Sequence, residues 1–112
     1  MLSTELSHLL FKFGVRFKFN TRVQQSDEEI GNYIAALPKL AENCNYSDKL
    51  DEMLRDRLVC GVHDDRVQRL LLMETNLTWD KAVTIASSHE AADKNVHILK
   101  NSAEQEVKIH EI

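Results

Sequence analysis

The stretch Gln24-Gln25-Ser26-Asp27-Glu28-Glu29-Ile30-Gly31-Asn32-Tyr33 decides how this chain folds. It opens with a polar turn in which Ser26 and Asp27 are both favourable helix N-caps, and two glutamates follow where the helix dipole favours negative charge. The apolar residues after them recur every three or four positions: Ile30, Tyr33, Ile34, Leu37, Leu40, Ala41 and Cys44. The pattern predicts a capped amphipathic helix over about 27–44 with one buried face.

Pro38 stands inside this predicted helix. Proline has no backbone N–H to donate to the carbonyl of Ile34, and in a regular helix interior it costs about 3 kcal/mol. We therefore expect the helix to kink or break near residues 34–37.

Three further helices are predicted downstream, over about 48–60, 65–74 and from residue 78 onward. Their expected caps are Ser47 or Asp48, Asp64 and Thr78 at the starts, and Gly61 as the C′ residue of the first. We expect Val67, Leu70, Leu71 and Met73 to point inward from the second of these helices. The apolar spacing continues weakly beyond residue 92, which predicts a long helix or a frayed helical tail over 94–112.

The N-terminal segment is ambiguous. Apolar residues over 2–13 share one helical face, whereas phenylalanines alternate with polar residues from Phe11 to Phe19. Alternation is typical of a strand, but no second strand-like run is present to pair with it. We expect a short helix followed by an extended connector over 14–25, with a β-ribbon between two copies as the alternative.

Composition indicates one domain with a real core, since the chain has 112 residues and is 43% hydrophobic. The formal net charge of −4 gives no overall basic field for nucleic acid. At most weak phosphate contacts are expected, through the N-terminal basic residues Lys12, Arg16, Lys18 and Arg22. Cys44 and Cys60 are expected to be buried thiols of a cytoplasmic protein, with a disulfide or an inter-subunit bridge as the alternative. No membrane segment is predicted.

Candidate catalytic and metal-binding groups are sparse. His63-Asp64-Asp65 places an imidazole beside two carboxylates, but these residues stand at a predicted helix start, where aspartate serves as a cap. His89, Asp93 and His97 are four residues apart and share one helical face, without the second imidazole of a metalloprotease helix. The sequence therefore predicts neither an enzyme nor a bound metal or cofactor.

Four motifs in order resemble the C-terminal capsid domain of Gag polyproteins from gypsy-type LTR retrotransposons. The first is the opening stretch, in which Gln24, Glu28, Ile30 and Tyr33 resemble the major homology region of retroviral and retrotransposon capsids. The others are Leu50-Asp51-Glu52-Met53-Leu54-Arg55-Asp56-Arg57-Leu58-Val59-Cys60-Gly61, Arg66-Val67-Gln68-Arg69-Leu70-Leu71-Leu72 and Leu77-Thr78-Trp79-Asp80-Lys81-Ala82. The resemblance runs from about Arg16 to Ala92.

The resemblance implies an all-α, compact bundle of about four to five short helices over 24–93. Residues 1–23 would be an extended N-terminal arm, or the end of a preceding capsid domain, and 94–112 a long C-terminal helix or tail. It also implies a polar network through Gln24 and Glu28. Retroviral members carry an arginine twelve residues after the glutamine, where this chain has Ala36, so part of that network is missing.

By the same resemblance, the function is self-association: dimerisation and assembly of a capsid shell or virus-like particle. The expected two-fold contact is the helix over 48–60, through Met53, Asp56, Arg57 and Cys60, with Asp56 facing Arg57 of the other copy. Met53 is equally consistent with a core position. The alternatives are a helical adaptor domain that binds a peptide of another protein, and a SCAN-like dimerisation domain of transcription factors.

Overall fold

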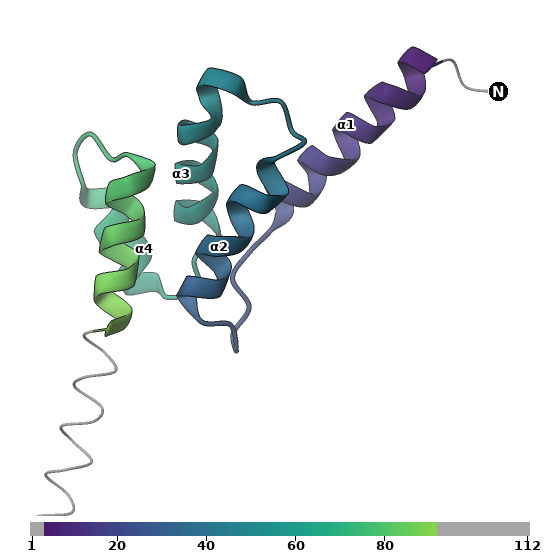
Figure 1. Cartoon of the computed structure of the whole chain (residues 1–112). Helices are drawn as coiled ribbons and strands as arrows, with labels where there is room; N and C mark the ends of the chain where they lie inside the picture. The colour runs from purple at the N-terminus through teal and green to yellow at the C-terminus, as the bar shows by residue number, and fades with distance from the viewer. Residues whose placement is uncertain (1–3, 92–112) are drawn as a thin grey trace, which may run out of the picture.

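A computed structural model describes residues 4–91, and Figure 1 shows an all-helical chain. The elements are α1 (Thr4–Thr21), α2 (Ile30–Ala41), the short 3₁₀ helix η1 (Ser47–Lys49), α3 (Leu50–Gly61), α4 (Asp65–Met73) and helical residues 79–91. No strand occurs among residues 4–91. The prediction of an all-α fold with four to five helices is confirmed.

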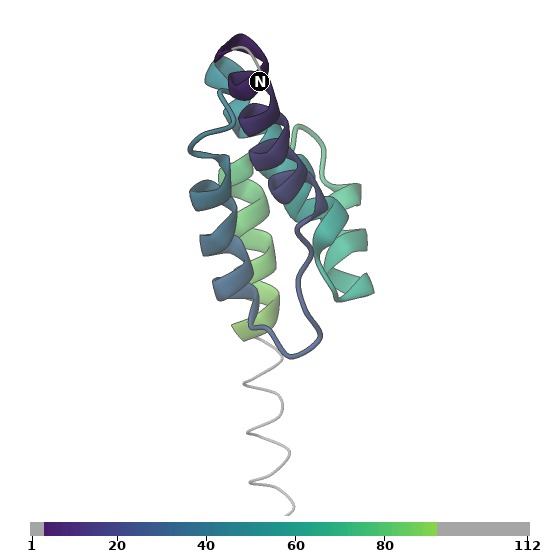
Figure 2. The ribbon, with the colours of Figure 1, turned by 90° about the vertical axis from the view of Figure 1, so that its right-hand side faces the viewer.

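One apolar core joins the helices. α2 packs against both α1 and α3, and α3 packs in turn on α4, so neighbours in sequence are neighbours in space (Figure 1; Figure 2 gives a second view). The buried core residues are Phe19, Ile30, Tyr33, Leu37, Ala41, Cys44, Leu54, Leu58, Val62, Val67, Leu71, Ala82 and Ala86. Every described α-helix contributes to this core, although α1 contributes Phe19 alone, and η1 contributes no buried residue.

The prediction of an extended N-terminal arm is wrong, because α1 is one continuous helix of 18 residues. A lone extended segment leaves its backbone N–H and C=O groups without strand partners, whereas a helix pairs them internally. The phenylalanines that alternate in sequence are thereby separated around the helix: Phe19 is fully buried and Phe17 is 68% exposed. The first part of α1 projects beyond the other helices in Figure 1.

α2 begins later than predicted. Ser26 and Asp27 lie in the preceding turn, and the backbone carbonyl of Glu29 accepts the first helical bonds, from Asn32 and Tyr33. The expected break before Pro38 does not occur, since α2 continues through the proline to Ala41. With only one turn left after it, the proline removes a single bond near the helix end.

Of the caps predicted for the later helices, Asp64 and Thr78 are confirmed, and Ser47 or Asp48 is wrong. Both of the latter lie in η1, and the N-cap of α3 is Lys49, without a side-chain hydrogen bond. The Asp64 carboxylate accepts the backbone N–H of Arg66 at 2.8 Å, and the Thr78 hydroxyl accepts that of Lys81 at 3.2 Å. Gly61 is not a C′ residue, because it lies in the last turn of α3 and its φ is not positive.

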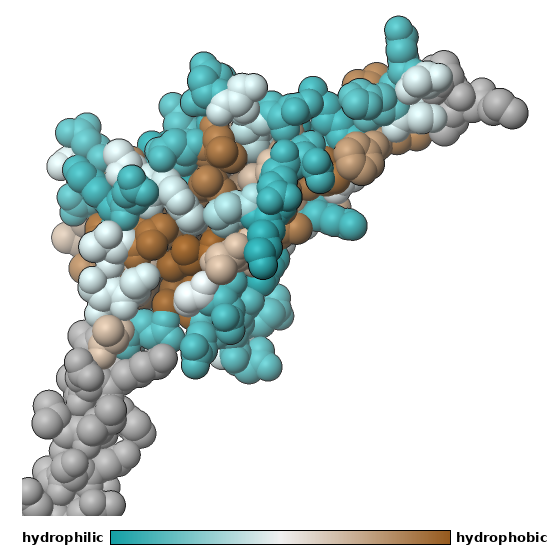
Figure 3. Space-filling model, viewed as in Figure 1, coloured by the Kyte–Doolittle hydropathy of each residue, from teal (hydrophilic) through white to brown (hydrophobic). Residues whose placement is uncertain are grey.

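Some residues expected inside are exposed. α4 buries Val67 and Leu71, whereas Leu70 is 44% exposed and Met73 is 79% exposed. A helix of nine residues has room for only one stripe against α3. Cys60 is exposed as well, and only Cys44 is a buried thiol. Figure 3 shows apolar side chains gathered between the helices and along α1.

Predictions for the tail over 94–112, and for Asp93 and His97, fall outside the described residues. Within residues 4–91 no helix is both long enough and apolar enough to cross a membrane.

Candidate functional site

Gln24 links three segments of the chain. Its backbone N–H donates to the carbonyl of Gly61 at 2.9 Å. Its side-chain Nε2 donates to the carbonyl of Glu28, and its Oε1 accepts from the backbone N–H of His63, both at 2.9 Å. One residue therefore fastens the segment over 22–29, here called the polar bend, to the end of α3 and the loop that follows it.

Glu28 closes the polar bend from the other side. Its two carboxylate oxygens accept from Nη1 and Nη2 of Arg22 at 3.0 and 2.6 Å, and Oε1 also accepts from the backbone N–H of Gln25 at 3.1 Å. The Arg22 guanidinium lies 5.3 Å from the centre of the Tyr33 ring. The hydrogen bonds from Arg22 hold the pKa of Glu28 below its ordinary value of 4.5, against a smaller opposing effect of burial.

Arg22 supplies a guanidinium that the sequence resemblance did not lead us to expect. The retroviral pattern has its arginine at the position of Ala36, and the sequence pattern alone places Arg22 among the basic residues of an N-terminal arm. In the structure Arg22 reaches Glu28 from the end of α1 and binds it with two parallel bonds. The signal in the sequence was an arginine six residues before the glutamate, on the opposite side of the turn.

Tyr33 and Gly61 form the apolar side of the site. The Tyr33 side chain is fully buried and its hydroxyl donates to the carbonyl of Arg57 at 2.8 Å, while burial raises the pKa of the phenol. A Cβ atom at Gly61 would overlap that hydroxyl and lie 2.9 Å from the carbonyl of Arg22. Glycine is therefore required for close approach, and not for a left-handed turn.

Ile30 lies beneath the polar bend and is only 6% exposed. It borders a small hollow of about 140 Å³ lined by Gln24, Glu28, Ile30, Asp64, Val67, Ala86, His89 and Glu90. The Asp64 carboxylate, already a helix cap, lies 3.9 Å from His89 Nε2. The structure thus brings together Gln24, Glu28, Ile30 and Tyr33.

The polar groups here hold backbone segments in place. Both functions of the Gln24 amide and both oxygens of Glu28 are occupied by groups of the protein itself. Within the described part of the chain, no group of three or more His, Cys, Asp and Glu side chains is placed to hold a metal ion. These hydrogen bonds hold the polar bend in one conformation and fasten it to the end of α3 and the loop that follows.

The residues expected at a dimer contact lie on α3. Asp56 and Cys60 are exposed, and Met53 is partly buried against the core. Arg57 points to the end of α1, where Nη1 donates to the carbonyl of Asn20. The carboxylate of Asp56 accepts from Nε of its neighbour Arg55 at 2.9 Å. Asp56 and Arg57 therefore both bind groups of their own chain.

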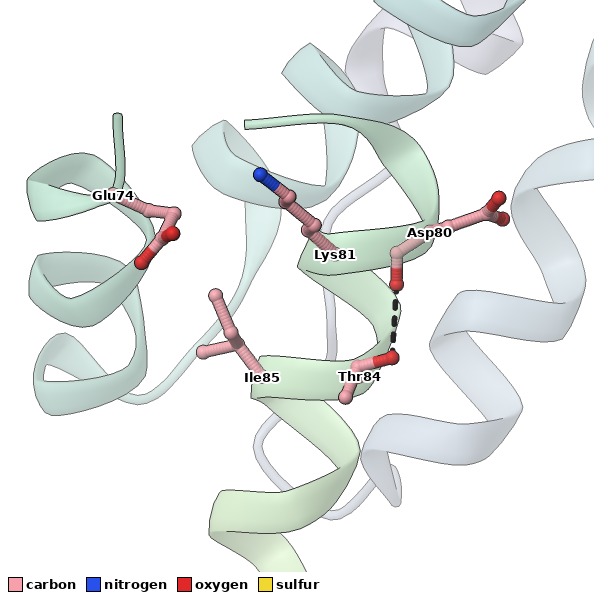
Figure 4. A pocket seen from close by; sticks show the side chains of 5 residues that line it. All are labelled: Glu74, Asp80, Lys81, Thr84 and Ile85. Carbon is pink, nitrogen blue, oxygen red and sulfur yellow. Dashed lines mark hydrogen bonds between the residues drawn. The ribbon is translucent and has the colours of Figure 1, made fainter. Parts of the chain in front are cut away.

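Two further hollows lie beside α4. The first, about 380 Å³, is lined by Arg55, Asp56, Val59, Cys60, Leu71, Leu72, Glu74 and Leu77. Figure 4 shows the second, about 340 Å³, lined by Glu74, Asp80, Lys81, Thr84 and Ile85. In it the Thr84 hydroxyl donates to the Asp80 carbonyl at 3.0 Å, and the Asp80 carboxylate points away from Lys81. These side chains do not converge as catalytic groups would.

Comparison with known proteins found no matching family model, no matching curated protein and no matching solved structure.

The ion pair of the polar bend predicts a pH dependence. Because the folded pKa of Glu28 is lowered, its contribution to stability is complete above the unfolded value, near 4.5, and is lost as the pH falls through the folded pKa. At pH 7 we expect Glu28→Gln to lower the free energy of unfolding by about 1 kcal/mol. The free energies of unfolding of the two proteins, measured by urea titration, should begin to approach each other below pH 4.5 and become equal below the folded pKa of Glu28.

Asp64, whose pKa is also lowered, is present in both proteins, so the difference between them isolates Glu28. A difference that stays constant down to pH 2 would contradict the assignment.

Proposed function

We propose that this chain is a structural self-association module, the C-terminal capsid domain of a Gag-like protein from a retrotransposon or from a gene derived from one. The observation that carries the proposal is the polar bend. Gln24 and Glu28 hold the bend between α1 and α2 together, and Gln24 fastens it to the end of α3 and the loop that follows, at the positions where the major homology region would do so. Such a module works in the cytoplasm by binding copies of itself and performs no chemistry.

A rigid small domain suits shell assembly because contact angles are reproduced only if each subunit holds one shape. The bend fixes the helices around a single core, and the exposed part of α3 then presents Asp56 and Cys60 at a constant orientation. A two-fold contact joins a patch to its own copy, so a few exposed residues on one helix are sufficient to define it.

The test is the mass of the full chain in solution. Sedimentation equilibrium from low to about 200 µM protein should show a mass rising above that of the monomer, 12.9 kDa. Asp56→Arg, which reverses an exposed charge on α3, should weaken association at least tenfold. Glu42→Arg, an equal charge reversal at the end of α2, should not. A chain that stays monomeric throughout would remove the proposal.

Arg57→Glu is a poor probe of this contact. Its guanidinium binds the end of α1 through the carbonyl of Asn20, so the substitution would disturb the fold before it disturbs a contact between copies.

The second candidate is an adaptor that binds a peptide of another protein. The 380 Å³ hollow between α3 and α4 favours it, because Leu71, Leu72 and Leu77 give it an apolar wall beside the exposed thiol of Cys60. An adaptor would be monomeric at every concentration, so the same sedimentation experiment separates the two functions.

A further inference from the structure

α1 has an inner side that attaches it to the rest of the protein. Phe19 is fully buried and packs against the Tyr46 ring, with ring centres 5.5 Å apart. Arg16 donates from Nε to the carbonyl of Cys44 at 2.9 Å, and its guanidinium lies 5.2 Å from the centre of the Tyr46 ring. Val15 packs partly against the same core. These residues define which way α1 faces.

The opposite side of α1 is apolar and exposed. Its members follow one another at spacings of three and four, and so form one stripe about 100° wide. This stripe, here called the outer face, consists of Leu6, Leu9, Leu10, Phe13 and Phe17, which are 42 to 68% exposed. Gly14 lies at its edge, with no atom within 4 Å of where a Cβ would be. The outer face is turned away from the core that the inner side contacts.

We infer that the outer face binds the outer face of a second copy of this chain, with the two α1 helices antiparallel. The inference rests on the proposed function and deepens it, because it adds a second surface for self-association, distinct from α3. A shell requires each subunit to make more than one kind of contact, since a single two-fold contact closes at a dimer.

An antiparallel arrangement makes the stripe complementary to itself. Leu6, Leu10, Phe13 and Phe17 are spaced four, three and four residues apart, the repeat of a coiled-coil seam. Reversing one copy sets Leu10 opposite Phe13 and Leu6 opposite Phe17, so that every layer pairs a leucine with a larger phenylalanine. A parallel arrangement would instead pair each residue with itself, giving two small leucine layers at one end and two crowded phenylalanine layers at the other. Gly14 at the edge allows the helices to approach closely.

Charges agree with the same arrangement. No charged residue lies on the outer face itself. Two outer faces can therefore meet without bringing like charges together in the centre of the contact.

The exposed area is sufficient for a weak specific contact. With the exposures above, the five side chains present on the order of 500 Å² per copy, comparable to the largest apolar patch of a typical monomer. Two copies would bury about 1,000 Å², the lower end for specific interfaces, where weak and transient contacts are found.

The test compares two substitutions in the full chain. Phe13→Glu puts a charge at the centre of the outer face, whereas Phe11→Glu makes the same change at a residue of similar exposure, 56%, off the face. Sedimentation equilibrium should show the dissociation constant rising at least tenfold for Phe13→Glu and remaining unchanged for Phe11→Glu. Equal helicity and melting temperature of both variants would show that they are folded. Equal effects on association from both substitutions would overturn the inference.

Mixing two variants tests the direction of the helices. In an antiparallel pair, Leu10→Lys of one chain faces Phe13→Glu of the other, so an equimolar mixture should associate more tightly than either variant alone, the α3 contact being the same in all three samples. Parallel helices would leave both charges opposite apolar residues, and the mixture would associate no more tightly than the single variants. That result would overturn the antiparallel register.

The failures of the two proposals are distinguishable. If the wild type is monomeric to about 200 µM, both the proposed function and the contact through α1 are wrong. If it self-associates and Asp56→Arg abolishes this while Phe13→Glu does not, the self-association function stands and the outer face is not a contact.

Discussion

Replacing Phe19 with alanine should lower the free energy of unfolding by about 3–5 kcal/mol. Phe19 is fully buried, is the only buried residue of α1 and packs on the Tyr46 ring. Its loss leaves a cavity between α1 and the core and removes the main attachment of that helix. A domain of this size has a total stability of about 5–10 kcal/mol, so the change should remove a large part of it. Urea denaturation followed by far-ultraviolet circular dichroism measures the effect.

Phe17 provides the matched control, two residues away in the same helix. Its side chain is 68% exposed, so Phe17→Ala at low protein concentration should change stability by less than about 0.5 kcal/mol. Similar losses for the two variants would mean that α1 does not face the core as described. Hydrogen exchange in α1 should accelerate in Phe19→Ala and not in Phe17→Ala.

The second large effect is expected at Gly61. We expect Gly61→Ala to destabilise the protein by about 2–4 kcal/mol, because the new methyl group overlaps the Tyr33 hydroxyl and must displace it from the carbonyl of Arg57. The backbone carbonyl of Arg22 would also lie 2.9 Å from the methyl group, so the polar bend must shift as well. Thermal and urea unfolding of the variant provide the measurement.

Gly31 is the control, since a Cβ atom there meets nothing within 4 Å. Gly31→Ala should stabilise the protein by about 0.5 kcal/mol, the ordinary gain for this change in a helix. Adding Tyr33→Phe to Gly61→Ala removes the hydroxyl that the methyl group would overlap, and should restore part of the lost stability. If the losses of unfolding free energy caused by Gly61→Ala and Tyr33→Phe simply add in the double variant, this explanation is contradicted.

The sequence was sufficient where structure is determined locally. Asp64 and Thr78 cap the helices that they precede, because a cap requires only a short polar side chain and the backbone N–H two or three residues later. The apolar spacing in α2 likewise predicted its buried residues Ile30, Tyr33 and Leu37. Such features depend on neighbours within one or two turns.

α1 shows where local pattern was insufficient. Phenylalanines at 11, 13, 17 and 19 satisfy the alternation of a strand as well as one or other side of a helix. The choice depends on whether a pairing strand exists, which is a property of the whole chain. Without one among residues 4–91, the helix is the conformation that pairs the backbone.

The polar bend shows a second limit. Its glutamine and glutamate stood out in the sequence, but the groups that they bind did not. His63 and Gly61 are more than thirty residues away from Gln24, and they contribute backbone atoms, which no residue type reveals. Gly61 was assigned to a helix end for the same reason, because the Tyr33 hydroxyl that requires it approaches from another helix.

The two thiols differ in access, and this makes the chain a ready labelling target. Cys60 is exposed on α3, whereas Cys44 is buried with its Sγ 3.3 Å from the carbonyl of Leu40. A maleimide dye added to the native protein would therefore attach at one site without any engineered cysteine. Cys44 would react only when the domain unfolds, so the rate at which a second label is attached would measure the rate of unfolding.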